Sequence, residues 1–84
     1  MKTKMILRIY NSKGELEQEY NEEQYQEIQK IFSEYMFLKF IVKAPYRVST
    51  KYNYDGTYQV TFKDTLNNYK FEFDGISSDS LRYI

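Results

Sequence analysis

The stretch YRVSTKYNYDGTYQVTF, residues 46–62, alternates apolar and polar side chains on both sides of NYDG and therefore predicts a β-hairpin. Its register decides which face of the sheet is apolar, because successive side chains of a strand point to opposite faces. A two-residue turn at Asp55-Gly56 would pair Val48 with Lys63. That pairing puts the apolar residues of the two strands on opposite faces, and a one-sided core excludes it.

A type I turn at residues 53–56, followed by a glycine bulge, pairs Asn53 with Thr57 and gives a consistent register. The apolar cross-strand pairs are then Tyr52 with Tyr58, Thr50 with Val60, and Val48 with Phe62. Such pairs contribute about 0.2–1 kcal/mol each. We therefore expect most tyrosines of the hairpin to stabilise the sheet. Tyr54 lies on the turn itself, and we expect its ring to be free to contact a partner.

The chain beyond the hairpin predicts a third strand at YKFEF, residues 69–73. A connecting loop of two or of four residues brings its apolar side chains onto the same face, so Phe62 pairs with Phe73 or with Phe71. The sequence leaves both registers open. The last segment, residues 76–84, is expected to add a final strand or to fray.

The chain before the hairpin begins with a predicted strand at residues 4–10, a turn at NSKGE and a returning strand at residues 16–20. Glu17 and Glu19 are expected on one face of the returning strand. Charged residues of this kind are typical of an edge strand, where they discourage unwanted pairing.

A helix is predicted to follow, with Asn21 as its cap, Gln24 three residues later, and Glu22 and Glu23 near its positive end. The predicted buried stripe has spacings of three and four residues and consists of Tyr25, Ile28, Ile31, Phe32, Tyr35 and Met36. Residues 37–43 fit either another helical turn or a short strand. Ala44-Pro45 ends this segment, because a residue before proline resists the helical conformation.

The order of these elements is a β-hairpin, a helix and a three-stranded meander. It predicts a single α+β domain spanning residues 1–84, with one amphipathic helix packed on one face of an antiparallel sheet. The strand order within the sheet stays open.

The composition argues against enzymatic chemistry. The chain of 84 residues has no histidine and no cysteine, which removes the commonest general base and the thiol nucleophile. Its 3 glycines are isolated, so no phosphate-binding loop can be assembled from them. The segment DGISSD, residues 74–79, lacks the alternating acidic pattern of a calcium loop and is expected to be a plain turn. We expect no catalytic residue, no cofactor and no metal.

Targeting signals and origin give a second set of expectations. The N-terminal stretch does not resemble a signal peptide, and the longest apolar run, YMFLKFIV, is far shorter than the roughly 20 residues of a membrane span. We expect a cytoplasmic protein that does not contact a membrane. Residues with AT-rich codons, such as Lys, Asn, Tyr, Ile and Phe, predominate, which suggests a bacterial, phage or mobile-element gene.

The charges balance, with 12 Lys plus Arg against 12 Asp plus Glu, but they are segregated along the chain. An acidic segment with tyrosines runs from the predicted edge strand into the helix: Glu15, Glu17, Glu19, Tyr20, Glu22, Glu23 and Glu27. Carboxylates concentrated in this way can imitate a nucleic-acid backbone or dock onto a basic groove. Our hypothesis is a small non-enzymatic protein-binding module that inhibits a host nucleic-acid enzyme on behalf of a phage or mobile element, with Tyr54 as an additional contact. The plain alternative is a solvated acidic surface.

A different hypothesis is single-stranded nucleic-acid binding by the basic face of the hairpin at residues 46–64. Its candidate contacts are Lys39, Lys43, Arg47, Lys51 and Lys63. In the predicted register the hairpin tyrosines lie on the other face, which weakens the argument for base stacking. A third possibility is a self-associating structural or accessory module that uses the edge strand or YMFLKFIV. The oligomeric state stays open.

Overall fold

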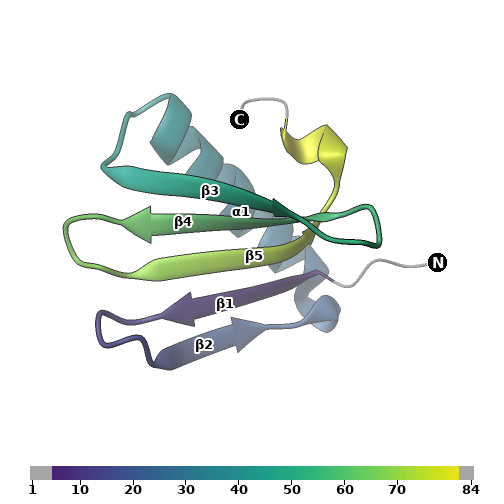
Figure 1. Ribbon diagram of the computed structural model, residues 1–84, viewed down its shortest axis with the longest axis horizontal. Helices are drawn as coiled ribbons and strands as arrows, with labels where there is room; N and C mark the ends of the chain where they lie inside the picture. The colour runs from purple at the N-terminus through teal and green to yellow at the C-terminus, as the bar shows by residue number, and fades with distance from the viewer. Residues whose placement is uncertain (1–4, 82–84) are drawn as a thin grey trace.

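The computed structural model describes residues 5–81, and within them an antiparallel five-stranded sheet carries a helix across one face (Figure 1). The elements in chain order are β1 (Ile6–Tyr10), β2 (Leu16–Tyr20), the 3₁₀ turn η1 (Glu22–Gln24), α1 (Tyr25–Phe40), β3 (Tyr46–Tyr52), β4 (Tyr58–Asp64), β5 (Lys70–Ile76) and the 3₁₀ turn η2 (Ser78–Leu81). The strand order is β2-β1-β5-β4-β3, so β2 and β3 are the edges. The predicted α+β fold is confirmed.

The β3–β4 hairpin has the predicted register, with Tyr52 opposite Tyr58, Thr50 opposite Val60 and Val48 opposite Phe62. The Asn53 backbone N–H donates to the Thr57 carbonyl oxygen at 2.8 Å, and the Gly56 N–H donates to the Asn53 carbonyl oxygen at 3.1 Å. Gly56 has a φ of +91°, in the left-handed region that a glycine bulge requires. The bulge therefore sets which face of this hairpin is apolar.

The loop between β4 and β5 decides the register that the sequence left open. Residues 65–68 form a four-residue loop in which the Asp64 carboxylate accepts hydrogen bonds from the backbone N–H groups of Leu66 and Asn67. Asn68 has a φ of 60°, a conformation that asparagine tolerates better than most residues. Phe62 consequently pairs with Phe71.

A bulge near the end of β5 returns its last residue to the core. Tyr58 pairs with Ile76 and Val60 pairs with Phe73, so β5 has one more residue than β4 over this interval. Gly75 lies in the bulge with a φ of 77°. Regular alternation would turn Ile76 away from Phe73, but the extra residue restores it to the same face, where it is 1% exposed.

The helix begins as predicted, and the structure shows where it ends, which the sequence left open. The Asn21 side chain accepts a hydrogen bond from the Glu23 N–H at 3.0 Å, and the Gln24 side chain accepts one from the Asn21 N–H. These bonds cap η1, and α1 follows without a break as far as Phe40, so residues 37–40 are helical. Tyr25 departs from the predicted buried stripe: it is 47% exposed, and its hydroxyl accepts a hydrogen bond from Gln29.

Two further expectations are corrected. Residues 78–81 form a 3₁₀ turn rather than a final strand, and residues 82–84 lie outside the described part of the chain. On β2, Glu17 and Glu19 do not share a face, because Glu17 is the extra residue of a bulge opposite β1. Glu19 contacts Arg8, whereas Glu17 contacts Tyr69, whose ring stacks on Phe71 on the helix side.

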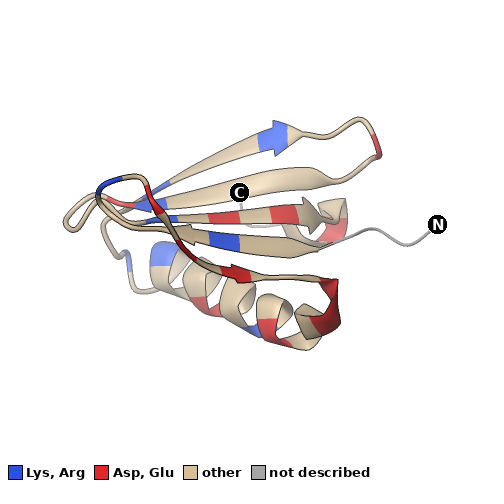
Figure 2. Cartoon of the chain, turned by 90° about the horizontal axis from the view of Figure 1, so that it is seen from below, with Lys and Arg blue, Asp and Glu red and all other residues tan. Residues whose placement is uncertain are grey.

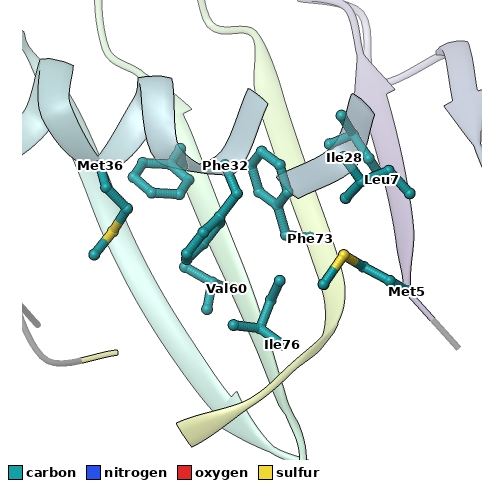
Figure 3. Packing of buried hydrophobic residues seen from close by; sticks show 9 residues of the cluster. Met5, Leu7, Ile28, Phe32, Met36, Val60, Phe73 and Ile76 are labelled. Atoms are coloured by element: carbon teal, nitrogen blue, oxygen red, sulfur yellow. The ribbon is translucent and has the colours of Figure 1, made fainter. Parts of the chain in front are cut away.

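The core lies between α1 and the covered face of the sheet (Figure 3). Ile28, Phe32 and Met36 project from the helix onto β1, β4 and β5. Phe32 meets Phe62 and Phe73 in edge-to-face contacts with ring centroids 6.1 and 5.1 Å apart. Such aromatic pairs stabilise a core beyond the burial of their area.

Candidate functional site

The acidic strip, as we call it, consists of the glutamates predicted to bind a partner, and the fold brings them together along one side of the molecule. Its members are Glu15, Glu17, Glu19, Glu22, Glu23 and Glu27, and all of them are exposed. The strip begins just before the edge strand β2, passes through η1 and enters the first turn of α1 (Figure 2). Because β2 is an edge strand, its outer backbone groups have no neighbouring strand among the described residues.

Three members of the acidic strip have side-chain partners. Glu19 forms an ion pair with Arg8 at 3.0 Å, and Glu15 accepts a hydrogen bond from the Asn11 side chain at 3.1 Å. The Tyr69 hydroxyl donates to Glu17 at 3.2 Å, and this hydrogen bond to a carboxylate raises the pKa of Tyr69. Within residues 5–81 only one carboxylate of the strip is thus neutralised by a cation.

A hollow of about 700 Å³ lies beside the acidic strip where η1 meets the end of β5. Glu22 and Glu23 line it together with Tyr25 and Gln29 of the helix and Ser77 after β5. Neither carboxylate has a hydrogen-bond or ion-pair partner for its side chain within the described part of the chain. A cationic side chain of a partner could pair with both carboxylates at this hollow.

The two tyrosines predicted as partner contacts lie apart from each other. Tyr20 ends β2, and its half-buried ring packs against the core, so it serves the fold. Tyr54 is fully exposed on the turn between β3 and β4, as predicted, but β3 is the edge of the sheet opposite β2. Next to it, hydrogen bonds from the Thr57 hydroxyl and N–H hold the pKa of the Asp55 carboxyl below its ordinary value. The structure does not bring Tyr54 into the acidic strip.

The face of the sheet opposite α1 is open and is turned toward the viewer in Figure 1. Its centre is electrostatically compensated: Arg8 of β1 forms ion pairs with Glu19 at 3.0 Å and with Glu72 of β5 at 3.4 Å. Towards the end of the sheet at which β3 begins, three cations lie side by side on neighbouring strands. We call Arg47, Lys63 and Lys70 the basic row, because Arg47 is opposite Lys63 and Lys63 is opposite Lys70.

The other predicted basic residues do not all lie beside the basic row. Lys39, in the last turn of α1, reaches the start of β3 and donates to the Tyr46 carbonyl oxygen at 2.7 Å. Lys51 is on the open face but opposite Gln59, beyond the row. Lys43 lies in the connection after α1 with a φ of 65°. Lys39 and the basic row line one hollow of about 490 Å³.

Sequence reasoning missed Lys70 and Tyr10. The Lys70 ammonium lies 4.6 Å from the centre of the Tyr10 ring, a cation–π contact at the end of the basic row. The open face therefore carries an aromatic side chain from β1, which the predicted register of the β3–β4 hairpin does not concern. Lys70 could have been found from the sequence, because a four-residue loop between β4 and β5 places it opposite Lys63. Tyr10 could not, because the pairing of β1 with β5 has no local signal in the sequence.

An apolar patch lies at the C-terminal end of α1, within the YMFLKFIV segment. Phe37, Ile41 and Val42 are 55%, 65% and 54% exposed, and a hollow of about 360 Å³ next to them is lined by Phe32, Met36 and Phe40 among others. This patch is one of the two surfaces that the self-association hypothesis names, and the edge strand is the other.

The described residues contain no group of three or more Asp, Glu, His or Cys side chains arranged to hold a metal ion. No helix between residues 5 and 81 is long and apolar enough to cross a membrane. Comparison of the chain with protein-family models, with curated proteins and with solved structures finds no match.

Proposed function

We propose that the protein is a non-enzymatic binding module that docks through its acidic strip onto a basic surface of a protein partner. The observation that carries the proposal is the position of the strip: exposed carboxylates follow an edge strand and continue into the start of the helix. An edge strand also offers unpaired backbone groups to a partner.

The acidic strip is larger than helix capping requires. The positive end of the helix accounts for Glu22 and Glu23, which lie in its first turn. It does not account for Glu15 and Glu17, which come before the helix. A surface that concentrates carboxylates in this way favours a partner with complementary positive charge and speeds association with it.

The class of partner follows from this charge. Proteins that act on nucleic acids present basic grooves to the phosphate backbone, and a strip of carboxylates can occupy such a groove as a competitor. We therefore propose that the partner is a nucleic-acid enzyme and that binding inhibits it. An AT-rich gene of phage or mobile-element type fits a small stoichiometric inhibitor of this kind.

The test is affinity capture from a bacterial lysate treated with nuclease, followed by mass spectrometry of the retained proteins. We compare the natural chain with a variant that carries Glu15→Gln, Glu22→Gln, Glu23→Gln and Glu27→Gln. These positions avoid the ion pair of Glu19 and the hydrogen bond of Glu17, and Glu15→Gln keeps a side-chain oxygen that can accept from Asn11. We expect the natural chain to retain a nucleic-acid enzyme and the variant to lose it.

Two control variants test whether capture depends on the acidic strip itself or on any change of surface charge. Glu34→Gln removes a carboxylate from an exposed position further along α1, and Arg47→Gln with Lys63→Gln neutralises part of the opposite region of the sheet. Both controls are expected to retain the partner. Equal capture by the four-residue variant and the natural chain would refute the proposal.

A further inference from the structure

The basic row is electrostatically unfavourable in the free protein. Arg47, Lys63 and Lys70 occupy directly opposed positions on three neighbouring strands, and like charges directly opposite each other destabilise a sheet. Within residues 5–81 the row forms one ion pair, between the Lys70 ammonium and Glu72 at 3.9 Å, and Glu72 is already shared with Arg8.

Protection of an edge strand does not explain this arrangement. Lysine and arginine on an edge strand discourage pairing with other chains, which accounts for Arg47 on β3. Lys63 and Lys70 belong to β4 and β5, which have neighbouring strands on both sides. Their charges do not protect an edge strand, so binding of an anionic ligand is the better explanation for them.

We propose that the basic row binds the phosphate backbone of a single-stranded nucleic acid. Adjacent strands lie about 4.8 Å apart, so the row extends about 10 Å across the sheet, which suits successive phosphates of an extended chain better than one isolated phosphate. The Ser49 and Thr61 hydroxyls line the same hollow as the row and can donate to phosphate oxygens. This site is separate from the acidic strip and does not depend on the function proposed for it.

Neighbouring groups hold two of the cations around the hollow in place. Tyr10 lies beneath the Lys70 ammonium at 4.6 Å and keeps it at one end of the row. At the other end, Lys39 is anchored on the Tyr46 carbonyl oxygen and adds a fourth cation to the hollow. The helix α1 lies on the other face of the sheet (Figure 1), so it is not placed to enter a duplex groove from the open face. These features favour a single strand over a duplex.

The test uses fluorescence anisotropy of a labelled oligothymidylate of about 15 nucleotides, titrated with the full chain at several salt concentrations. Contacts with three phosphates predict a slope of about −2 for log K against log salt, which is a roughly twentyfold loss between about 50 and about 200 mM. Each of Arg47→Gln, Lys63→Gln and Lys70→Gln is expected to reduce the slope by about 0.7. The triple variant is expected to lose binding.

Control variants keep the result interpretable. Lys30→Gln removes a charge from the exposed side of α1 and is expected to leave binding unchanged. The triple variant should remain folded, because none of its three side chains belongs to the core, and thermal unfolding checks this. The four-residue glutamine variant of the acidic strip should bind the oligonucleotide at least as tightly as the natural chain.

The proposal fails if no anisotropy change occurs at about 20 mM salt, where phosphate contacts are strongest. It also fails if the triple variant binds as well as the natural chain, or if a duplex of the same length binds more tightly than the single strand. Pyrophosphate can be added at the same concentration of phosphate groups as the oligonucleotide. If it displaces the oligonucleotide, the site binds small phosphates and the assignment to a nucleic-acid backbone is wrong.

Discussion

Lys63 of β4 lies directly opposite Lys70 of β5 on the face of the sheet that α1 leaves open. Two ammonium groups in this relationship repel each other, and neither strand is an edge on which charge would discourage aggregation.

Replacing Lys63 by glutamine should therefore stabilise the protein. We expect the free energy of unfolding to rise by about 0.2–1 kcal/mol, because the substitution removes repulsion from both Lys70 and Arg47. Urea unfolding at low salt measures the change. At about 1 M salt, where charges are screened within about 3 Å, the gain should shrink. Lys30→Gln is the matched control, and a loss of stability on Lys63→Gln would contradict the interpretation.

The core should respond to the loss of a single methyl group. Ile28 is fully buried between α1 and the sheet, so Ile28→Val is expected to lower the free energy of unfolding by about 0.5–1.5 kcal/mol. Ile41 is 65% exposed, and the same substitution there should change stability by less than about 0.5 kcal/mol. Equal effects at the two positions in urea unfolding would mean that the core is placed incorrectly.

The turn of the β3–β4 hairpin should depend on Gly56 for its conformation. Apart from the residues on either side of it in the chain, nothing lies within 4 Å of where a Cβ would be at this position, so an alanine there would meet no obstacle. Its φ of +91° is nevertheless unfavourable for an L-residue, and Gly56→Ala should cost about 1 kcal/mol. Thermal unfolding measures the cost. The neighbouring Tyr54→Ala should leave the midpoint unchanged, since its side chain is fully exposed.

Stability should fall in alkaline solution because of Tyr35. Burial, with smaller effects from Tyr46 and nearby carboxylates, raises the pKa of Tyr35 to about 12. A group whose pKa is higher in the folded than in the unfolded state stabilises the fold fully below the unfolded value, near 10, and this contribution is lost as pH rises toward 12.

Urea unfolding between about pH 9 and pH 12 tests this expectation. Tyr35→Phe should remove the part of the decline that Tyr35 causes. Tyr52→Phe serves as the control, because Tyr52 is 57% exposed. If Tyr35 titrates with the exposed tyrosines in the ultraviolet spectrum, the raised pKa is refuted.

The sequence predicted the local elements well because their signals are short-range. Asn21 and Gln24 form the expected capping box, and the bulge at Gly56 gives the expected register of β3 and β4. The acidic strip was also visible in advance, because its members are close neighbours along the chain. Tyr25 was misplaced because periodicity alone does not show how far the sheet extends beneath the first turn of the helix.

The sequence by itself determined the succession of strands and helix along the chain, the register of the β3–β4 hairpin and the exposure of Tyr54. The signals for these features, namely the alternation of apolar residues, turn chemistry and helix capping, act over a few residues. Only the tertiary structure decided that β1 pairs with β5, which joins the first hairpin to the meander, and that Arg47, Lys63 and Lys70 form one row. The physical reason is that contacts between strands far apart in the chain depend on how the whole apolar surface is buried together, and no single segment encodes that.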